Sequence, residues 1–416
     1  MAKRKHGCLS CHWLAKVWAA CLASTLMVAL CSGNVLRAAD LVRSNSPLAS
    51  GATVQLEYHE TDYTIVNLSL SITPRSMAFR KEPALAFGRV VRGFLNFGGS
   101  SSNDIPFLWQ PDAGKLFLDV NRNRDLTDDP DGVYTTRAAG PASYQTFTNV
   151  HLPFNTPAGK RPVLANLNLY GSSSPLRCIA AVRSFWEGRL TLQGRDWQAG
   201  LISSNLNPLA PFEESRLLLR PWSERDQPFS AYGGLLDAVP FSRNLFLNGY
   251  AYQVTCAAAA QNGQTAAALQ FTAQSVATGE LKINGNSIRR LMLAGGPYLV
   301  VLDQPEGTVQ IPTGSYGQFS VQLGQGGAAF YYNSDLRLPG RQISVDGLTP
   351  ASLTVGGPLT NSVAITRQPQ DLVLNYQLIG AGGETYRLAN RDSAHPPEFA
   401  IYQGDRQIAS GKFEFG

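Results

Sequence analysis

Apolar and polar residues alternate along many short stretches of this 416-residue chain. The alternation is clearest at 163–170, 318–323 and 372–378, where every second side chain is apolar. Successive side chains of a β-strand point to opposite faces of its sheet, so this pattern predicts strands with one buried face and one solvated face. Long amphipathic helical patterns are absent from the sequence. The chain is therefore expected to be mostly β.

Turn signals separate the predicted strands. The dipeptides Asn262-Gly263 and Asn284-Gly285 tolerate positive φ angles and are typical of two-residue β-hairpin turns. Short strands at regular spacing favour sandwiches or open barrels.

A domain boundary is predicted near residue 276. The preceding region, 40–275, contains four tryptophans and many loops rich in Pro, Ser and Asn. Predicted strands then follow one another densely from 280 to 415. We expect an N-terminal antiparallel β-domain at 40–275 and one or two β-sandwich modules at 276–416, with the split near residue 347 if there are two.

The C-terminal region contains phrases that resemble a known type of module. Residues 311–316, which read Ile-Pro-Thr-Gly-Ser-Tyr, are similar to the proline–glycine–tyrosine turn of Ig-like and prealbumin-like modules. The segments 382–386 and 409–416 resemble the closing strands of such modules, and the whole chain is similar to exported β-rich bacterial proteins. The resemblance implies Ig-like β-sandwich modules in the C-terminal region, a fold that hosts many functions.

The first 39 residues have the character of a signal peptide. Lys3, Arg4 and Lys5 form a basic start, and an apolar run of 15 residues follows at 17–31. A membrane span needs about 20 apolar residues, so this run suits a signal peptide better. The mature chain is expected in the periplasm, on the cell surface or outside the cell, with cleavage between about residues 32 and 40. An uncleaved signal anchor is the alternative, and no later segment is apolar enough to span a membrane.

Export also changes the charge and the cysteine content. The chain has 35 basic and 30 acidic residues, and the first 39 residues contain five of the basic ones and no acidic ones. The part from Asp40 onward is therefore balanced, and nucleic acid is not an expected partner. Of the six cysteines, Cys178 and Cys256 lie after the signal segment. Either a disulfide or two buried thiols would suit them, and the sequence leaves both open.

One segment has the composition of a metal site. Oxygen-bearing side chains occur at every second position from 119 to 127, and three more carboxylates follow by residue 131. Ca²⁺ binds about six to eight oxygen ligands. The segment resembles the Asp-x-Asn-x-Asn calcium loops of the EF-hand and dockerin families. The resemblance implies a structural Ca²⁺ held by Asp119, Asn121, Asn123 and Asp125, with Asp128, Asp129 or Asp131 closing the shell.

The loop departs from those families in three ways. Arg124 stands at the sixth position, where a glycine is usual, and Pro130 stands at the twelfth, where a glutamate is usual. Leu116 and Leu118 alternate as in a strand, so we expect the loop to join two strands instead of two helices. The alternative is a loop of Asx turns, in which Asp and Asn side chains accept hydrogen bonds from nearby backbone.

Other sites of chemistry are not indicated by the sequence. It lacks the GxSxG, Walker A, GxGxxG and HExxH patterns. His59, His151 and His395 are each expected to be isolated surface or core residues. The neighbouring Arg289 and Arg290 are expected to form a solvated strand face and not a phosphate site. The tryptophans suit sugar stacking, although burial is the commoner role.

These observations favour an exported, non-catalytic envelope or extracellular protein with a structural calcium loop. Its β-modules would bind an unidentified surface polymer or protein partner. The alternative is a secreted hydrolase acting on carbohydrate or peptide, with its site in the N-terminal domain. That enzyme would use carboxylates of the 119–131 loop, in a cleft lined by paired carboxylates and tryptophans. No catalytic residue is assigned.

Overall fold

The computed structural model describes residues 44–45, 50–74, 78–98, 101–137, 144–171, 176–229, 237–325, 328–333, 342–369, 371–388 and 397–413. The signal segment 1–39 and His395 lie outside these residues. The regular elements within them are β-strands and three-residue 3-10 helices, which confirms the mostly β prediction. No helix in this part of the chain is long and apolar enough to cross a membrane.

The three predicted strands are confirmed as β9, β23 and β28. The elements up to residue 240 are β1 (Ser44–Asn45), β2 (Ala52–Glu60), β3 (Val66–Pro74), β4 (Val91–Asn96), η1 (Ser101–Asn103), β5 (Ile105–Gln110), η2 (Pro111–Ala113), β6 (Lys115–Leu118), η3 (Pro130–Gly132), β7 (Val133–Thr135), β8 (Tyr144–Thr156), β9 (Gly159–Tyr170), β10 (Arg177–Val182), β11 (Ser184–Leu192), β12 (Arg195–Ile202), η4 (Phe212–Glu214), β13 (Arg216–Pro221), η5 (Trp222–Glu224) and β14 (Ala238–Pro240).

The remaining elements are strands. They are β15 (Asn244–Leu247), β16 (Tyr250–Gln261), β17 (Gln264–Gln274), β18 (Ala277–Asn284), β19 (Ile288–Ala294), β20 (Leu299–Asp303), β21 (Thr308–Pro312), β22 (Gly314–Tyr316), β23 (Gln318–Gln325), β24 (Ala328–Asn333), β25 (Ile343–Val345), β26 (Ala351–Thr354), β27 (Thr360–Arg367), β28 (Leu372–Ile379), β29 (Thr385–Leu388), β30 (Glu398–Gln403) and β31 (Arg406–Lys412).

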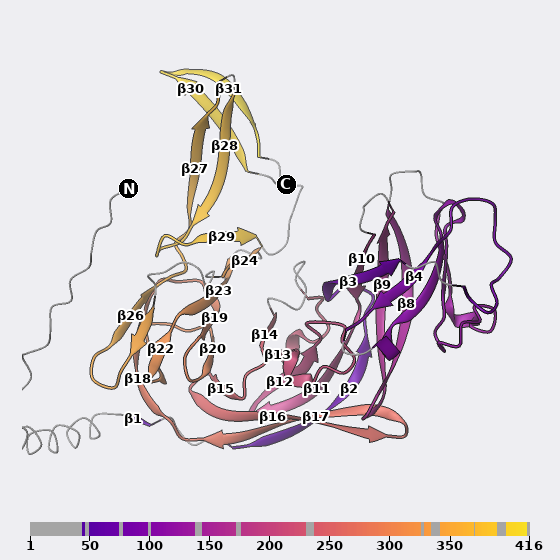
Figure 1. The fold of residues 1–416 in the computed structure, drawn as a ribbon. Helices are drawn as coiled ribbons and strands as arrows, with labels where there is room; N and C mark the ends of the chain where they lie inside the picture. The colour runs from indigo at the N-terminus through magenta and orange to yellow at the C-terminus, as the bar shows by residue number, and fades with distance from the viewer. Residues whose placement is uncertain are drawn as a thin grey trace, which may run out of the picture.

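The first core lies among strands β3 to β10. These strands pair antiparallel in the spatial order β7–β6–β5–β4–β3–β10–β9–β8. Phe107, Trp109 and Phe147 are fully buried between them. This part forms the right-hand end of the molecule in Figure 1 and carries the predicted calcium loop.

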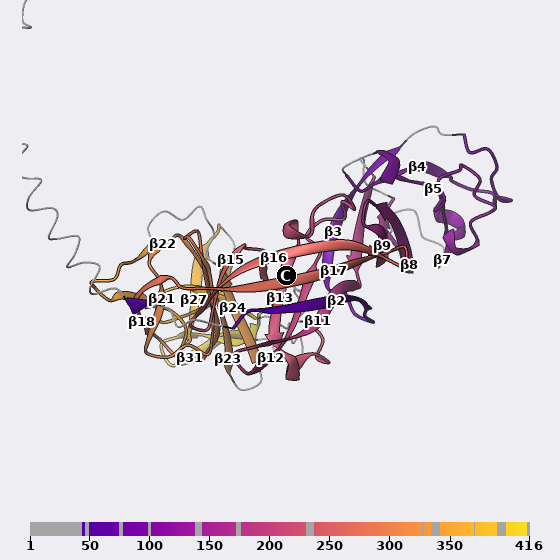
Figure 2. The ribbon, with the colours of Figure 1, turned by 90° about the horizontal axis from the view of Figure 1, so that it is seen from below.

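The second core is enclosed by an antiparallel run of strands in the order β14–β13–β12–β11–β2–β17–β16–β15. Strands β16 and β17 form a long hairpin whose turn is Asn262-Gly263, with φ angles of 52° and 75°. This predicted hairpin is confirmed. Figures 1 and 2 show it extending along the molecule between the two ends.

The third core lies between two groups of strands at the other end. One group is β21–β18–β26, and the other is β15–β20–β19–β23, in which β15 and β20 are parallel. Leu281, Leu291 and Ile311 are fully buried between these groups. Strands β15 and β20 lie on opposite sides of residue 276, so hydrogen bonding between strands crosses the predicted domain boundary. That the two regions are separate folding units stays a prediction.

The predicted hairpin at Asn284-Gly285 is wrong. Strand β18 ends at Asn284, but it pairs with β21 and β26, whereas β19 pairs with β20 and β23. Gly285 has a φ of 154°, and a Cβ there would lie 1.7 Å from the carbonyl oxygen of Val355. Glycine is needed because two backbone segments approach closely, and not because the chain reverses into a hairpin.

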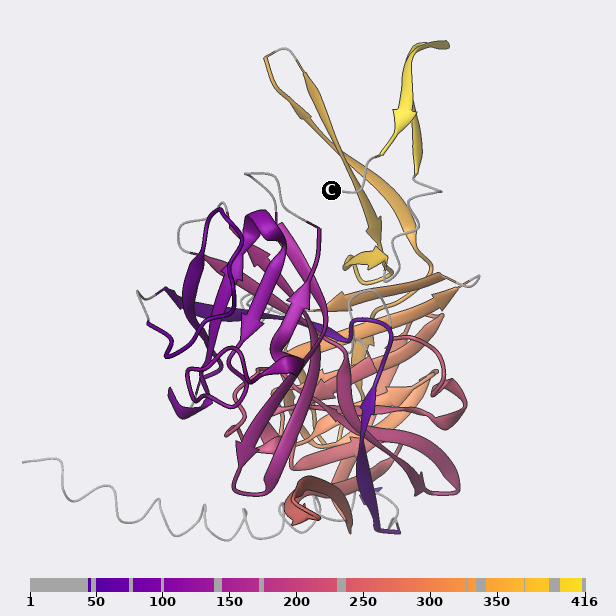
Figure 3. The ribbon, with the colours of Figure 1, turned by 90° about the vertical axis from the view of Figure 1, so that its right-hand side faces the viewer.

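Two hairpins at the C-terminal end project from the rest of the molecule. Strands β27 and β28 pair along their full length, and β30 and β31 form a separate two-stranded sheet. Figure 3 shows both hairpins, in orange and yellow, rising above the remaining strands. Apolar side chains of β27 and β28 such as Ile365 and Leu372 are exposed.

Cys178 and Cys256 are both free thiols. Cys178 is buried in the first core, and Cys256 packs against the second. Of the two alternatives left open by the sequence, the structure shows separate thiols packed as small apolar side chains.

Candidate metal centre

The predicted calcium loop connects β6 to β7, which pair antiparallel from Lys115 opposite Thr135 to Phe117 opposite Val133. The expectation that the loop joins two strands is confirmed. Gly132 closes the foot of the loop, where a Cβ atom would lie 2.3 Å from the carbonyl oxygen of Leu118. The sequence therefore places glycine where the two ends of the loop come together.

A small apolar cluster and backbone bonds hold the loop in place. Leu126 is buried against Phe79, Leu108 and Phe117. The backbone N–H of Leu126 donates to the carbonyl of Lys81 at 3.1 Å, and the N–H of Arg80 donates to the carbonyl of Arg124 at 2.8 Å. The loop is thus fixed on one side by the segment that precedes β4.

Arg124 adopts the backbone conformation that the sixth position of a calcium loop requires. Its φ angle is 68°, and that of Arg122 is 63°, both in the left-handed region that favours glycine. The absence of glycine at the sixth position therefore does not prevent the sharp turn. The Arg122 guanidinium donates to the carbonyl of Val120 within the loop and to the carbonyls of Asn103 in η1 and Pro153 in β8, and so fastens the turn to these two elements.

Side-chain oxygens of the loop accept backbone hydrogen bonds in a regular series. Asn121 Oδ1 accepts from the N–H of Asn123 at 3.0 Å, and Asn123 Oδ1 accepts from Asp125 at 2.6 Å. Asp125 Oδ1 accepts from Thr127 at 2.9 Å. These are Asx turns, so the alternative interpretation describes the present hydrogen bonding. The Oδ1 atoms of Asn121 and Asn123 each keep a second lone pair, so an Asx turn and metal ligation are compatible there. Asp125 Oδ1 also accepts from the hydroxyl of Thr127 at 2.6 Å, which leaves Asp125 Oδ2 as its ligand oxygen.

The carboxylates at the end of the loop differ in their surroundings. Asp128 is exposed and accepts from the side-chain amides of Asn121 and Asn123, at 3.2 and 2.6 Å. Asp131 is exposed within η3. Asp129 is buried, and its Oδ1 accepts from the N–H of Asn121 at 3.3 Å.

Two buried carboxylate oxygens of the loop have no hydrogen-bond partner among the described residues. Asp119 is fully buried, and its Oδ2 accepts from the N–H of Arg124 at 2.9 Å, but its Oδ1 has no partner. Asp129 Oδ2 also has no partner. Burial raises the pKa of both carboxyl groups, and the nearby Asp128 carboxylate adds to the rise. Such oxygens are costly to bury unless a cation or a proton compensates them.

The donor set fits a hard cation, but it is not gathered into a closed shell. Among the described residues, no group of three or more His, Cys, Asp and Glu side chains is arranged to hold a metal. The loop supplies carboxylate, amide and hydroxyl oxygens only, which are the ligands that Ca²⁺ prefers. Asn121 and Asn123 direct their amide nitrogens toward Asp128, so a bound cation would have to replace these two hydrogen bonds.

The loop borders neither of the two cavities described for the molecule. The larger, of about 500 Å³, lies beside the β16–β17 hairpin and contains one carboxylate, that of Glu57. Its lining is formed by Leu56, Glu57, Tyr58, Pro162, Trp186, Gln261, Asn262, Gln264, Thr265 and Ala266. Trp109, Trp186 and Trp197 are all buried. The cleft of paired carboxylates and tryptophans expected for the hydrolase is not found at either cavity.

Two histidines have carboxylate neighbours that the sequence did not indicate. His59 Nδ1 lies 3.4 Å from Oε1 of the buried Glu187, which also accepts from Arg225 at 3.1 Å. His151 Nδ1 lies 3.8 Å from Glu60 Oε1. Glu187 is on β11, which pairs with β2, so sheet pairing and not sequence proximity brings the first pair together.

The expectation of a solvated face at Arg289-Arg290 is wrong for Arg290. That residue is 6% exposed, and its Nε donates to Asp303 Oδ1 at 2.7 Å, whereas the side chain of Arg289 is 42% exposed. Adjacent side chains of a strand point to opposite faces, and in a layered protein one of those faces is covered. Two adjacent arginines in a predicted strand therefore already indicate that one of them faces the covered side of the sheet.

Comparison of the chain with models of protein families, with curated proteins and with solved structures finds no match.

Proposed function

We propose that this chain is an exported, non-catalytic envelope or extracellular protein in which the β6–β7 loop binds a structural Ca²⁺. The observation that carries the proposal is a pair of buried oxygens, Asp119 Oδ1 and Asp129 Oδ2, that have no partner in the part of the chain that the structure describes. Both belong to a loop that contains five carboxylates within 13 residues. A cation between them compensates charge that the surrounding backbone N–H groups satisfy only in part.

The residues of the β6–β7 loop would have different roles in binding Ca²⁺. Asp119 and Asp129 supply charge from the buried side of the loop. Asn121, Asn123 and Asp125 supply side-chain oxygens that the Asx turns already hold. Asp128 completes the coordination shell on the exposed side once its hydrogen bonds with the side-chain amides of Asn121 and Asn123 are broken. Asp131 is left as the least favoured ligand because it is exposed in η3.

The finer fold assignment and the partner belong to the same proposal. The third core lies between two groups of strands, as in a β-sandwich. The buried Tyr316 donates its hydroxyl to the carbonyl of Pro312 at 2.8 Å, a contact similar to the tyrosine corner of Ig-like modules. These features support an Ig-like C-terminal module, which would engage an unidentified surface polymer or protein.

Thermal unfolding with Ca²⁺ and with EDTA tests the metal site. A ligand that binds only the folded state at a thousandfold excess over Kd adds about 4 kcal/mol to the free energy of unfolding. We therefore expect the melting temperature to rise in millimolar Ca²⁺ and to fall back when EDTA is added. Mg²⁺ should substitute poorly because it demands a smaller octahedral shell.

Asp119→Asn is the decisive variant because it keeps the shape of the side chain and removes the charge. It should lose most of the Ca²⁺-dependent rise, yet in EDTA it should melt at or above the wild-type temperature, since it removes an uncompensated buried charge. Asp405→Asn, a change of the same charge at an exposed position in the β30–β31 turn, should respond to Ca²⁺ like the wild type. Equal melting of wild type in Ca²⁺ and EDTA would leave the loop as a series of Asx turns.

A further inference from the structure

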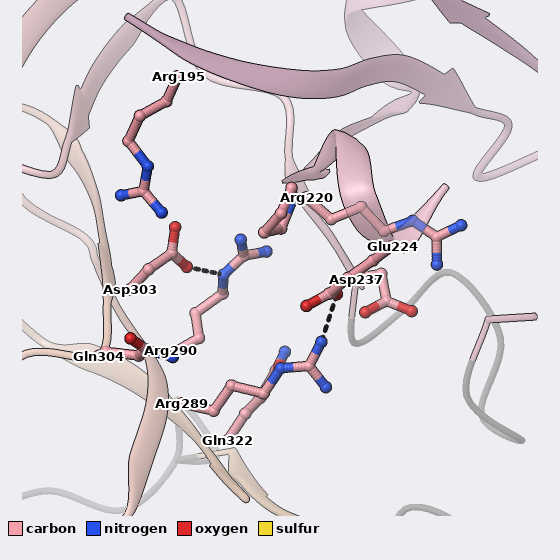
Figure 4. A pocket seen from close by; sticks show the side chains of 10 residues that line it. Arg195, Arg220, Glu224, Asp237, Arg289, Arg290, Asp303, Gln304 and Gln322 are labelled. Atoms are coloured by element: carbon pink, nitrogen blue, oxygen red, sulfur yellow. Dashed lines mark hydrogen bonds and ion pairs between the residues drawn. The ribbon is translucent and has the colours of Figure 1, made fainter. Parts of the chain in front are cut away.

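We propose that a second, independent site binds a phosphate-type oxyanion in a cavity lined by arginines. The cavity has a volume of about 50 Å³ and is shown in Figure 4. Its lining consists of Arg195, Arg220, Pro221, Glu224, Asp237, Arg289, Arg290, Asp303, Gln304 and Gln322. The lining residues come from several separate segments between residues 195 and 322, so no sequence motif marks the site.

The cavity lies between two walls. Arg195 and Arg220 come from β12 and β13, whereas Arg289 and Arg290 come from β19. In Figure 4, Arg195 extends from one wall toward the wall that carries Asp303 and Arg290. Three guanidinium groups, those of Arg195, Arg289 and Arg290, thus share the cavity with three carboxylates. The guanidinium of Arg220 points away from them and donates to the Gln198 side chain and to the carbonyls of Arg225 and Gln227.

Two of the carboxylates are already committed to arginines. Glu224 Oε2 lies 2.5 Å from a terminal nitrogen of Arg289, and this ion pair connects the two walls. Asp303 Oδ1 accepts from Arg290 Nε at 2.7 Å, and its Oδ2 accepts from the side-chain amide of Asn248 at 3.2 Å. Both carboxylate oxygens of Asp303 therefore accept hydrogen bonds from residues other than Arg195.

Guanidinium donors are left over on both walls. Among the described residues Arg195 makes no hydrogen bond or ion pair, and its contact is with the ring of Trp197, 5.2 Å away. Arg290 is almost fully buried but donates only through Nε to a described residue. Its terminal nitrogens carry further N–H donors, which have no acceptor among the described residues and remain available to a ligand in the cavity.

A compact oxyanion suits these guanidinium donors better than other classes of ligand do. It offers several charged acceptor oxygens to guanidinium groups, which form short charge-assisted bonds with phosphate. The volume admits one such group together with little else, since a water molecule needs about 10–15 Å³ of the same space. The three guanidinium groups disfavour a metal cation, and the charged lining disfavours an apolar ligand. The anion is either free phosphate or the phosphate group of a phosphorylated molecule.

Isothermal titration calorimetry of the protein with inorganic phosphate, in EDTA so that calcium does not interfere, tests the site. The wild type should bind phosphate, and Arg195→Gln should weaken binding by about tenfold or more, the effect of losing a hydrogen bond to a charged group. Arg367→Gln removes the same charge from an exposed position on β27 and should leave the affinity unchanged. Asp237→Asn removes a negative charge from the lining and should tighten binding.

The outcomes separate the sources and decide the proposal. Glycerol 3-phosphate binding more tightly than inorganic phosphate identifies a phosphorylated molecule as the ligand, and the reverse order identifies the free ion. No binding by the wild type up to about 10 mM phosphate overturns the proposal, as does equal weakening in Arg195→Gln and Arg367→Gln. If Arg195→Gln does not fold, an unchanged affinity in Asp237→Asn overturns it.

Discussion

Burial is the main influence on the chemistry of Cys178 and Cys256. Removal from water disfavours the thiolate and raises the pKa of each thiol to about 12, and for Cys256 the Glu213 carboxylate adds to the rise. We therefore expect a disulfide-exchange reagent to label the folded protein slowly at pH 8 and the urea-unfolded protein rapidly. Rapid labelling of both thiols in the folded protein would contradict this.

The raised thiol pKa makes the stability of the folded protein depend on pH in a defined direction. The folded pKa of about 12 lies above the ordinary thiol pKa of 9.0, so between these values the folded state keeps protons that the unfolded state loses. The contribution of the two thiols is present below pH 9 and is lost as the pH rises toward 12. The urea midpoint of unfolding should therefore fall as the pH is raised from 8. The midpoint of Cys178→Ala should fall less steeply with pH than that of the wild type.

At the scale of elements, strands that share a core differ from strands that do not. β3, β9 and β10 are paired on both edges and contribute to the first core. Strand β27 pairs only with β28 among the described strands, and Ile365 and Leu372 of this hairpin are 67% and 51% exposed. Apart from two residues of β29 that pair with β28, no other described strand joins this hairpin, and an isolated hairpin is only marginally stable in water.

Amide hydrogen exchange should reveal this difference. The amides of β27, β28, β30 and β31 are expected to exchange much faster than those of β3, β9 and β10, because local opening of a hairpin with few buried apolar side chains costs little free energy. The β16–β17 hairpin, whose Val254, Leu269 and Phe271 are buried, serves as the matched control and should be protected. Equal protection of the projecting hairpins would mean that another surface covers them in solution.

At the scale of the whole molecule, the balance of charge depends on processing. The chain of 416 residues has a formal net charge of +5, and the excess resides in the first 39 residues. N-terminal sequencing of protein recovered from the periplasm or medium should start between about residues 32 and 40, and its isoelectric point should lie below the value of 8.8 for the full chain. Soluble cytosolic protein that retains Met1 would contradict export.

The sequence by itself determined the local features of this protein. Alternation located strands such as β9, β23 and β28, because the period of a strand is a property of the backbone. Asn262-Gly263 located its hairpin because positive φ at both positions is a local requirement. The oxygen-rich loop between β6 and β7 was also visible, since its residues lie next to one another in the chain.

Only the tertiary structure decided which distant residues meet. Asn284-Gly285 has a hairpin sequence, yet β18 and β19 enter different groups of strands, and the glycine serves a close contact with Val355. Burial of Asp119 and Asp129 depends on packing of the loop and not on its composition. The arginine cavity is assembled from strands of two walls, because strand pairing and layer packing are long-range and leave no fixed spacing in the sequence.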